Sequence, residues 1–388
     1  METAPPGRRV ATDTQPAPVR SPPAATIPTR VRHVAVVTDA WHPQINGVVQ
    51  TWTRMDAELR AHGLRVTLVT PDGAPSLPVP GEPELRLVTR PGPHVQRALD
   101  AAMADPREPL QALHIATEGP LGWAARAWAR RRERPFTTSY HTRYPEYLAA
   151  RFGVPAAWTR AVVRRFHARS QAVLAATPQM VTTLSAQGFE RVRLWPRGVD
   201  AGLFAPGARD ALDGLGLTRP IWLSIGRVAR EKNLEAFLAL DLPGSMVIVG
   251  DGPARTALQR RHPRVHWLGA RAHATLPPLY RAADVFVFPS RTDTFGLVML
   301  EAMACGTPVA AFPVTGPVDV VETGRTGVLD EDLRTACLGA LSLDRDTVRR
   351  AVQDRGWHEV ARILGAALVP FDAPGALGSA RPELIRYA

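Results

Sequence analysis

The sequence predicts an α/β protein built from two domains, each with its own parallel sheet. The chain has 388 residues, which exceeds the size at which a single hydrophobic core stops growing. Short apolar runs alternate with helical stretches of about 10–15 residues, a pattern typical of βαβ units. The pattern restarts after a loop-rich link at residues 192–207, which indicates a second unit of the same kind.

The first half contains the apolar runs and helices of one sheet. Strands are expected to begin in residues 33–39, 65–72, 85–91, 110–119, 135–147 and 172–178. Helices are expected from Gly47 to about His62, within 121–132 after a Gly-Pro start, and around 156–171. Their alternation indicates a parallel sheet.

The second half repeats this organisation. Four short apolar strands, most of them ending in Gly or Ser, are expected at residues 220–227, 245–252, 264–270 and 283–290. Helices are expected between or after them, at residues 232–240, 254–261, 276–282 and 296–304.

These patterns divide the chain into four parts. Residues 1–30 form a Pro- and Ala-rich tail without the apolar segment of a signal peptide, and we expect it to be disordered. An N-terminal domain is expected over 31–200 and a C-terminal domain over 201–354. Residues 355–388 begin with an amphipathic helix, which we expect to cross back to the first domain. Its apolar face holds Trp357, Val360, Ile363 and Leu364.

Composition places the chain among ordinary globular proteins. It is 45% hydrophobic and 21% charged, and it lacks the run of about 18 apolar residues that a spanning helix needs. Its two cysteines, Cys305 and Cys337, are too few for a disulfide framework and suit a reducing compartment. We therefore expect a cytoplasmic protein.

The charge of the chain is uneven. The first 200 residues hold 26 Arg against 16 Asp and Glu, whereas the remainder is nearly balanced, with 21 basic and 20 acidic residues. The chain contains 46 arginines but a single lysine, Lys232. Because Arg and Lys are not interchangeable in a tight phosphate site, this lone lysine is a candidate functional residue.

The best-placed ligand-binding residues follow the apolar runs of the second half, because open parallel sheets bind ligands beyond the carboxyl ends of their strands. Arg227 and Lys232 follow the first of these strands, and Gly250 follows the second. Phe295 and Gly296 lead from the last strand into a helix, whose N-terminal N–H groups favour a phosphate. We expect the two cations to neutralise a pyrophosphate there. The alternative is a solvated helix start and an ordinary turn.

Two carboxylates lie close to this predicted phosphate site in the sequence. Asp293 precedes the helix, and Glu301 lies within it, eight residues later. Glu301 is flanked by Leu300 and Ala302, so that, if buried, it needs a partner or a ligand. Both carboxylates are therefore candidates for contact with sugar or ribose hydroxyls.

The first half supplies two weaker candidates. Asn46 and Gly47 stand at a strand-to-helix turn, where glycine permits close backbone approach to a ligand. His141 follows a strand within the polar segment SYHTRYPEY. A structural role is the alternative for both, since Asn-Gly marks many turns and single histidines are often structural.

Taken together, these motifs resemble glycosyltransferase family 4, the retaining enzymes of GT-B fold. The resemblance covers about residues 33–370 and depends on HPQINGVVQT, YHTRYPEY, SIGRVAREKN, GDGP and PSRTDTFGLVMLEAMACGTPV. It is strongest to bacterial lipid mannosyl-, glucosyl- and sulfoquinovosyl-transferases. It implies two Rossmann-like domains facing a central cleft, and transfer of a hexose from a nucleotide sugar to a lipid or glycan acceptor. Mannose, from GDP-mannose, is the favoured sugar.

The resemblance also implies roles for the first-domain residues and for the helix start. Gly47 would lie against the donor phosphates, with Asn46 and Asp39 nearby, and backbone N–H groups of 295–296 would meet the same phosphates. His141 would contact the transferred sugar close to its reacting carbon.

In the second domain, the implied roles concern the leaving group and the sugar. Arg227 and Lys232 would hold the diphosphate, and Glu301 would bind the ribose hydroxyls. Asp293 takes the place of the first glutamate in the family's E-x7-E motif and is one methylene shorter, which leaves the donor sugar open.

No cofactor or metal is expected, because preorganised cations can stabilise a departing diphosphate. Two D-x-D sequences, at 330–332 and 344–346, fall at probable helix starts and are interpreted as helix caps.

The basic first half predicts a further partner, an anionic membrane. Trp123, Trp128 and the arginines of 126–134 lie on one expected helix, and Trp158, Phe166 and the arginines of 160–169 lie on another. Basic helices with aromatic residues can rest on anionic membranes, which suits a lipid acceptor and the inner face of the cytoplasmic membrane. A solvated arginine-rich surface is the alternative.

Three other functions fit parts of the sequence. A non-hydrolysing sugar-nucleotide epimerase would share the fold. A dinucleotide-dependent oxidoreductase would share the α/β pattern, but no G-x-G-x-x-G follows a strand. A nucleic-acid-binding protein would explain the net charge of +11, but the arginines are dispersed and no binding module is recognisable, so no nucleic-acid partner is expected.

Overall fold

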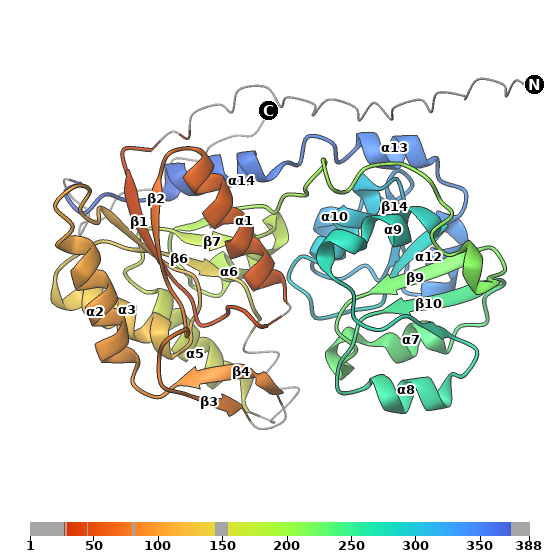
Figure 1. Cartoon of the computed structure of the whole chain (residues 1–388), viewed down its shortest axis with the longest axis horizontal. Helices are drawn as coiled ribbons and strands as arrows, with labels where there is room; N and C mark the ends of the chain where they lie inside the picture. The colour runs from red at the N-terminus through yellow and green to blue at the C-terminus, as the bar shows by residue number, and fades with distance from the viewer. Residues whose placement is uncertain (1–26, 28, 45, 80–81, 144–153, 374–388) are drawn as a thin grey trace, which may run out of the picture.

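The computed structural model describes residues 27, 29–44, 46–79, 82–143 and 154–373. Two α/β domains lie side by side, one from each half of the chain (Figure 1). Each contains a six-stranded sheet, and the predicted fold class is confirmed. Among the described residues, no helix is both long enough and apolar enough to cross a membrane.

The first sheet has the strand order β2-β1-β5-β6-β7-β8, and all neighbouring strands are parallel. Every residue of its interior strand β1 is buried, as expected for a strand covered by helices on both faces. The strands are β1 (His33–Val37), β2 (Arg65–Val69), β5 (Ala112–Ile115), β6 (Thr137–Tyr140), β7 (Val173–Ala175) and β8 (Val192–Leu194). The helices are α1 (Gly47–Ala61), α2 (Pro91–Met103), α3 (Pro120–Arg131), α5 (Ala156–His167) and α6 (Pro178–Ala186).

The apolar run at 85–91 does not join this sheet, so its assignment to the sheet is wrong. β3 (Ser76–Val79) and β4 (Glu82–Val88) form a separate antiparallel pair. Leu77 and Leu87 of this pair are 63% and 50% exposed. These two leucines therefore lie on the surface, whereas Val88 is buried in the core of the first domain.

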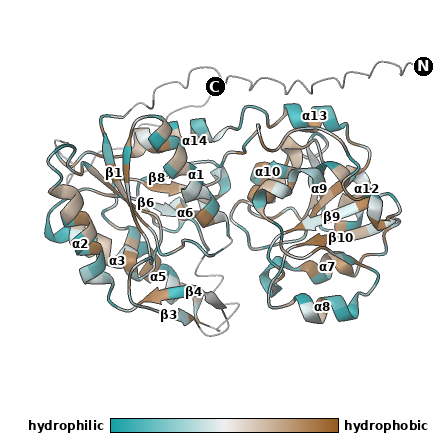
Figure 2. Ribbon diagram, viewed as in Figure 1, coloured by the Kyte–Doolittle hydropathy of each residue, from teal (hydrophilic) through white to brown (hydrophobic). Residues whose placement is uncertain are grey.

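The second sheet has the strand order β11-β10-β9-β12-β13-β14 and is also parallel. Its strands are β9 (Ile221–Ile225), β10 (Ser245–Val249), β11 (His266–Trp267), β12 (Val285–Phe288), β13 (Val309–Ala311) and β14 (Gly327–Leu329). Its helices are α7 (Leu234–Leu238), α8 (Arg255–Arg261), α9 (Pro277–Ala282), α10 (Leu297–Ala304), α11 (Pro317–Val320), α12 (Leu333–Ala340) and α13 (Arg345–Arg350). In both domains the apolar residues concentrate on the strands and inner helix faces (Figure 2).

The last helix, α14 (Trp357–Ala367), returns to the first domain as predicted. Trp357, Val360 and Leu364 are buried in the core that includes β1 and α1, and Ile363 packs against its edge. The indole N–H of Trp195 donates to the carbonyl of Val360 at 3.0 Å. Figure 1 shows this blue helix beside the red α1.

Candidate active site

The carboxyl ends of three strands meet at one edge of the second sheet, because the strand order β10-β9-β12 places their loops side by side. Gly250, directly after β10, has a φ of +141°. A Cβ on Gly250 would lie 1.8 Å from the carbonyl oxygen of Gly226, so that only glycine fits. Gly250 therefore lets two of these loops touch, and its contact with a donor stays a prediction.

Lys232 and Asp293 form an ion pair between two of these loops. Lys232 ends a 3-10 turn after β9, and its Nζ lies 2.6 and 2.9 Å from the two carboxylate oxygens of Asp293, in the loop after β12. Burial acts to raise the pKa of Asp293, but the charge and hydrogen bonds of Lys232 hold it below its ordinary value. The lone lysine is thus neutralised by the carboxylate that the sequence placed in the same site.

Arg227 belongs to the same edge of the sheet. Its Nη1 lies 3.6 Å from Oε1 of Glu231. The backbone carbonyl of Glu231 accepts hydrogen bonds from the hydroxyls of Thr292, at 3.2 Å, and Ser290, at 3.4 Å. These bonds tie the segment that carries both predicted cations to the loop that leads into α10.

The start of α10 requires a glycine. Gly296 has a φ of +84°, and a Cβ there would lie 2.8 Å from Met299 and 2.9 Å from Phe288. The preceding Phe295 is buried in the core and fixes the loop from the other side. The loop into α10 also holds Asp293, the partner of Lys232, so a cation and the N-terminus of a helix belong to the same loop pair, an arrangement that favours an anion.

Glu301 is buried in α10 and is paired, as a buried carboxylate must be. The hydroxyl of Tyr280 donates to Oε2 at 2.8 Å, and Nε2 of His273 lies 2.8 Å from Oε1. Burial, with the charge of Glu301 as a further cause, holds the pKa of Tyr280 well above its ordinary value, so that its hydroxyl remains a donor. A ribose would have to share Glu301 with these partners, and that role stays a prediction.

On the opposite side, Asn46 and Gly47 begin α1. The side-chain oxygen of Asn46 caps the helix by accepting from the N–H groups of Val48 and Val49, both at 3.0 Å. A Cβ on Gly47 would lie 3.8 Å from Cδ1 of Leu297, the first residue of α10. The starts of α1 and α10 therefore face each other across the domain boundary.

Asp39, which the resemblance places near the donor phosphates, has its carboxylate bonded within the first domain. Its carboxylate accepts from the N–H groups of Leu121 and Gly122 and from the hydroxyl of Thr117, at 2.8, 3.3 and 2.8 Å. Burial nevertheless holds its pKa above the ordinary value. Both oxygens are thus engaged at the start of α3, within the first domain.

His141 lies at the carboxyl end of β6, and its side chain is turned into the first domain. Its Nε2 is 3.0 Å from both the indole N–H of Trp52 and the hydroxyl of Ser139, and its Nδ1 is 3.1 Å from Nη2 of Arg197. Its backbone carbonyl accepts from the hydroxyl of Thr294, in the second domain, at 2.9 Å. A sugar contact through the ring would have to share or replace these partners.

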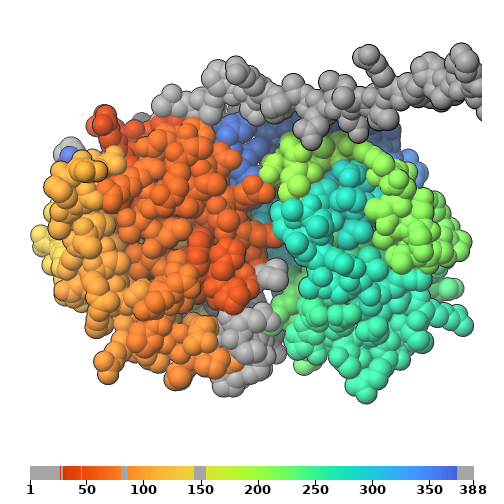
Figure 3. Space-filling view, viewed as in Figure 1, coloured from red at the N-terminus to blue at the C-terminus, as the bar shows by residue number. Residues whose placement is uncertain are grey.

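Two predicted residues of the first domain, Gly47 and His141, thus contact the second domain at Leu297 and Thr294. We call this place the domain junction and define it by these four residues. Figure 3 shows the two halves in contact along this side of the molecule. Lys232 joins the junction through Asp293, the residue before Thr294.

Comparisons with known proteins identify the family of the chain. Residues 45–203 match the family described as Glycosyltransferase Family 4, and residues 219–341 match Glycosyl transferases group 1. The GDP-mannose-dependent alpha-mannosyltransferase of Mycobacterium tuberculosis is 34% identical over 324 residues, which cover 76% of this chain and 83% of that relative. The chain is a family-4 glycosyltransferase.

Further proteins resemble the glycosyltransferase in sequence or in fold. A Corynebacterium glutamicum protein with the same name is 28% identical, covering 77% of each chain. Sucrose-phosphate synthase from Thermosynechococcus elongatus superposes with a TM-score of 0.71 at 25% identity, over 86% of this chain and 98% of that one. Anabaena HepE in complex with UDP-glucose shares the fold, with a TM-score of 0.66 at 18% identity over 86% and 98%.

These findings confirm the GT-B fold and a nucleotide-sugar-dependent hexosyltransferase. The epimerase alternative receives no support from them, since the named relatives are transferases or synthases.

Sequence reasoning missed the residue that faces the ring of His141. The guanidinium of the buried Arg197 donates to the carbonyls of Trp195 and Pro196, at 2.7 and 3.1 Å, and lies over the Trp195 ring. Burial lowers its pKa to about 9. Arg197 follows β8, in the segment WPRGVD, just as Arg227 follows β9. This signal was available in the sequence, but the segment was interpreted as part of the link between the domains.

The contacts of the His141 ring disfavour its protonation. The indole of Trp52 and the guanidinium of Arg197 can only donate, yet each faces one ring nitrogen. A neutral imidazole has one N–H and can accept at its other ring nitrogen. A protonated ring has an N–H at both nitrogens and would therefore oppose both donors. Burial, then the charge of Arg197, and then His114 hold the pKa of His141 well below its ordinary value.

The first basic helix is not the surface that the sequence suggested. In α3, Trp128 is fully buried, and Arg126 is buried and donates to the carbonyls of Phe166 and Arg165. Trp128 and Arg126 therefore cannot face a membrane, whereas Arg130, Arg131 and Arg132 at the end of α3 are exposed, and the membrane contact of this helix stays a prediction. In α5, Phe166 is likewise buried, whereas Trp158 is 75% exposed.

The two D-x-D sequences cap helices, as interpreted. Asp332 accepts from the first N–H groups of α12, and Asp344 accepts from Thr347 in α13. No group of three potential metal ligands occurs among the described residues.

Proposed function

We propose that this glycosyltransferase transfers mannose from GDP-mannose, with retention of anomeric configuration, to a hydroxyl of a lipid or glycan acceptor. The observation that carries the proposal is the pairing of Lys232, the only lysine, with Asp293 beside the start of α10. The donor is supported by three relatives named GDP-mannose-dependent alpha-mannosyltransferases, 28–34% identical to the chain.

In this proposal, donor binding exchanges the partner of Lys232. The diphosphate carries more negative charge than one carboxylate, so it draws the ammonium group away from Asp293. The released carboxylate of Asp293 then accepts a hydroxyl of the mannose. The ion pair thus holds both side chains in place before the donor arrives.

The transfer step moves one bond at the sugar. The acceptor oxygen bonds to C1 of mannose while the bond from C1 to the β-phosphate oxygen breaks, and the bonding electron pair leaves with GDP. The proton of the acceptor hydroxyl passes to the departing phosphate oxygen on the same face, which retains the configuration. Arg227, Lys232 and the N-terminus of α10 stabilise the growing negative charge, and the scheme uses no metal.

A donor screen tests the proposal. GDP-mannose should raise the melting temperature of the purified protein more than UDP-glucose or ADP-glucose does, because binding to the folded state stabilises it. The mannosylated product should carry an α-linkage by NMR. Equal stabilisation by all three donors, or a β-linked product, would contradict the donor assignment or the stereochemistry, respectively.

We further propose that α5 places the acceptor side of the enzyme on an anionic membrane, at the inner face of the cytoplasmic membrane. Trp158 and Val162, one helical turn apart, are 75% and 54% exposed, and Arg164 and Arg165 beside them are exposed as well. An apolar pair flanked by arginines suits the interface of a lipid surface.

Co-sedimentation with vesicles tests this membrane contact. The Trp158→Ser/Val162→Ser variant should lose most of the binding to vesicles that contain phosphatidylglycerol. A matched control, Leu341→Ser, changes a 37% exposed leucine in the second domain and should bind as the wild type does. Equal recovery of the wild type with neutral and anionic vesicles would mean that the arginines contribute no electrostatic attraction to membrane binding.

A further inference from the structure

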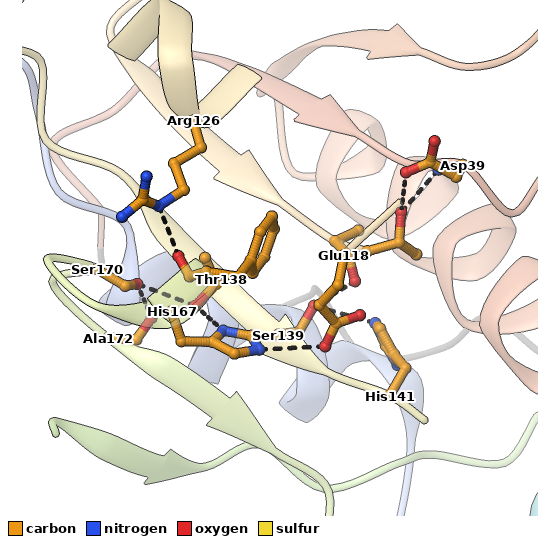
Figure 4. A network of polar contacts seen from close by, with 12 residues as sticks. Asp39, Glu118, Arg126, Thr138, Ser139, His141, His167, Ser170 and Ala172 are labelled. Carbon is orange, nitrogen blue, oxygen red and sulfur yellow. Dashed lines mark hydrogen bonds and ion pairs between the residues drawn. The ribbon is translucent and has the colours of Figure 1, made fainter. Parts of the chain in front are cut away.

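A buried carboxylate at the edge of the first sheet is not used by any step above. Glu118 lies three residues after β5, and its side chain is only 6% exposed. Strands β5 and β6 pair Ile115 with Thr138, and the same offset brings Glu118 level with His141. Figure 4 shows both residues at the ends of neighbouring strands. Glu118 therefore lies on the first-domain side of the domain junction.

One oxygen of Glu118 is anchored by a chain of polar contacts. Oε1 lies 3.1 Å from Nε2 of His167, and Nδ1 of His167 lies 2.9 Å from the hydroxyl of Thr138 (Figure 4). Thr138 donates to the hydroxyl of Ser170 at 3.0 Å, and Ser170 donates to the carbonyl of Ala172 at 2.6 Å. Because each hydroxyl has one hydrogen to give, Thr138 must accept from Nδ1 of His167.

This direction of donation implies that a proton is shared between Glu118 and His167. With Nδ1 of His167 already protonated, the contact at Nε2 needs one more proton, carried either by the imidazole or by the carboxyl group. In both cases a hydrogen bond holds Oε1 and keeps the plane of the carboxyl group in one orientation.

The second oxygen, Oε2, is buried and has no hydrogen-bond partner among the residues that the structure describes. The N–H groups of Leu121 and Gly122, at the start of the following helix α3, are already given to Asp39. A buried carboxylate oxygen without a partner is unfavourable. This oxygen therefore requires a donor group from outside the fold.

For a substrate to reach this edge, the domains would have to separate. The loop of Thr294 lies over the edge, since its hydroxyl bonds to the carbonyl of His141. Opening of the junction would uncover the carboxyl ends of β5 and β6, and closing it would exclude water from the bound substrate.

We propose that Oε2 of Glu118 accepts a hydrogen bond from a hydroxyl of the acceptor substrate, and that His167 is the positioning residue that holds the carboxyl group. The inference rests on the proposed function and concerns its acceptor, which must carry a sugar or polyol group next to the attacking oxygen. No bond forms or breaks at Glu118. A buried oxygen left without a donor is unfavourable, so the bond from the acceptor hydroxyl contributes to acceptor affinity.

The test separates acceptor binding from donor binding. Methyl α-D-mannoside, octyl β-D-glucoside and myo-inositol are titrated into the full chain with GDP present, and binding is followed by saturation-transfer NMR. Glu118→Gln should weaken the best-bound probe at least tenfold while the thermal stabilisation by GDP-mannose stays at the wild-type value. The matched control, Glu235→Gln, removes an exposed carboxylate on α7 and should change neither quantity.

A second variant, Glu118→Asp, covers the case in which Glu118→Gln fails to fold. It keeps the carboxyl group but withdraws the oxygen by one methylene. We expect it to lose the same tenfold in affinity for the best-bound probe. Wild-type probe affinity in both variants would overturn the proposal, as would the absence of binding of all three probes to the wild-type chain. If GDP-mannose stabilises the wild type while the variants bind the probes normally, only this inference fails. If GDP-mannose does not stabilise the wild type, the proposed function fails.

Discussion

The hydroxyl of Thr294 donates to the backbone carbonyl of His141 at 2.9 Å, and this bond connects the two domains at the site itself. A second connection, from the N–H of Gln179 to the carboxylate of Asp319 at 3.1 Å, joins the start of α6 to α11. Thr294 lies between Asp293 and the turn into α10, so the residue that bonds across the junction belongs to the loop of the proposed donor site. We therefore expect contact between the domains to affect donor binding through this one segment.

Thr294→Val removes this hydrogen bond and keeps the branched side chain. Loss of one net hydrogen bond of about 1 kcal/mol should lower kcat/KM for transfer about fivefold. Steady-state kinetics at a fixed acceptor concentration measure the effect. Thr182→Val, which removes an exposed hydroxyl bonded within α6, should leave kcat/KM unchanged. An equal loss in both variants would mean that the bond across the junction has no special role.

Lys232→Ala should lower kcat at least a hundredfold, the order of magnitude expected for loss of one preorganised charge on a departing group. Arg227→Ala should act in the same direction, because both cations face the same proposed diphosphate. Transfer rates at saturating GDP-mannose measure the loss. Arg264→Ala, at an exposed position before β11, is the control and should keep the wild-type rate. Normal turnover of Lys232→Ala would refute the leaving-group role.

Asp293 should make the folded protein sensitive to acid. Its folded pKa is lowered by Lys232, so its contribution to stability is present above the unfolded pKa of about 3.9 and disappears as the pH falls through the folded value. Urea denaturation at pH 7 should therefore show a smaller free energy of unfolding for Asp293→Asn than for the wild type. The difference should vanish towards pH 2, and a difference that does not change with pH would contradict the ion pair.

The positions of the donor-site candidates could be predicted from the sequence, because each follows an apolar strand. Arg227 follows β9, and Gly250 follows β10. Gly296 stands at the start of the helix to which β12 leads. Parallel pairing brings such positions to one edge of the sheet. The pairing of Lys232 with Asp293 was not predicted. It depends on the distance in space between two loops, and the separation of two residues along the chain does not determine that distance.

What the sequence could not show depends on packing between distant segments. The apolar run at 85–91 has the pattern of a sheet strand, and only its partner β3 makes it a surface hairpin. Trp128 and Arg126 have the composition of a membrane-facing helix, and only the neighbouring helices bury them. Arg197 lies next to His141 in space, although 56 residues separate them in the chain.

The last prediction concerns Arg197 as a positioning residue for His141. In the wild type, burial and then the positive charge of Arg197 hold the pKa of His141 well below its ordinary value, so the ring is neutral near neutral pH and its titration should not change the rate there. Arg197→Met removes the charge and the hydrogen bond to Nδ1. The pKa of His141 should then rise, and the acid limb of the kcat profile should move to higher pH.

Arg197→Lys separates this effect from a loss of packing. Lysine keeps the positive charge beside His141 but lacks the planar fork that reaches the carbonyls of Trp195 and Pro196 together with Nδ1. Its kcat should be lower than that of the wild type, yet its acid limb should stay at the wild-type position. If Arg197 only filled space, both variants would lower kcat by a factor independent of pH, because a merely structural defect does not change which protonation state of His141 is favoured.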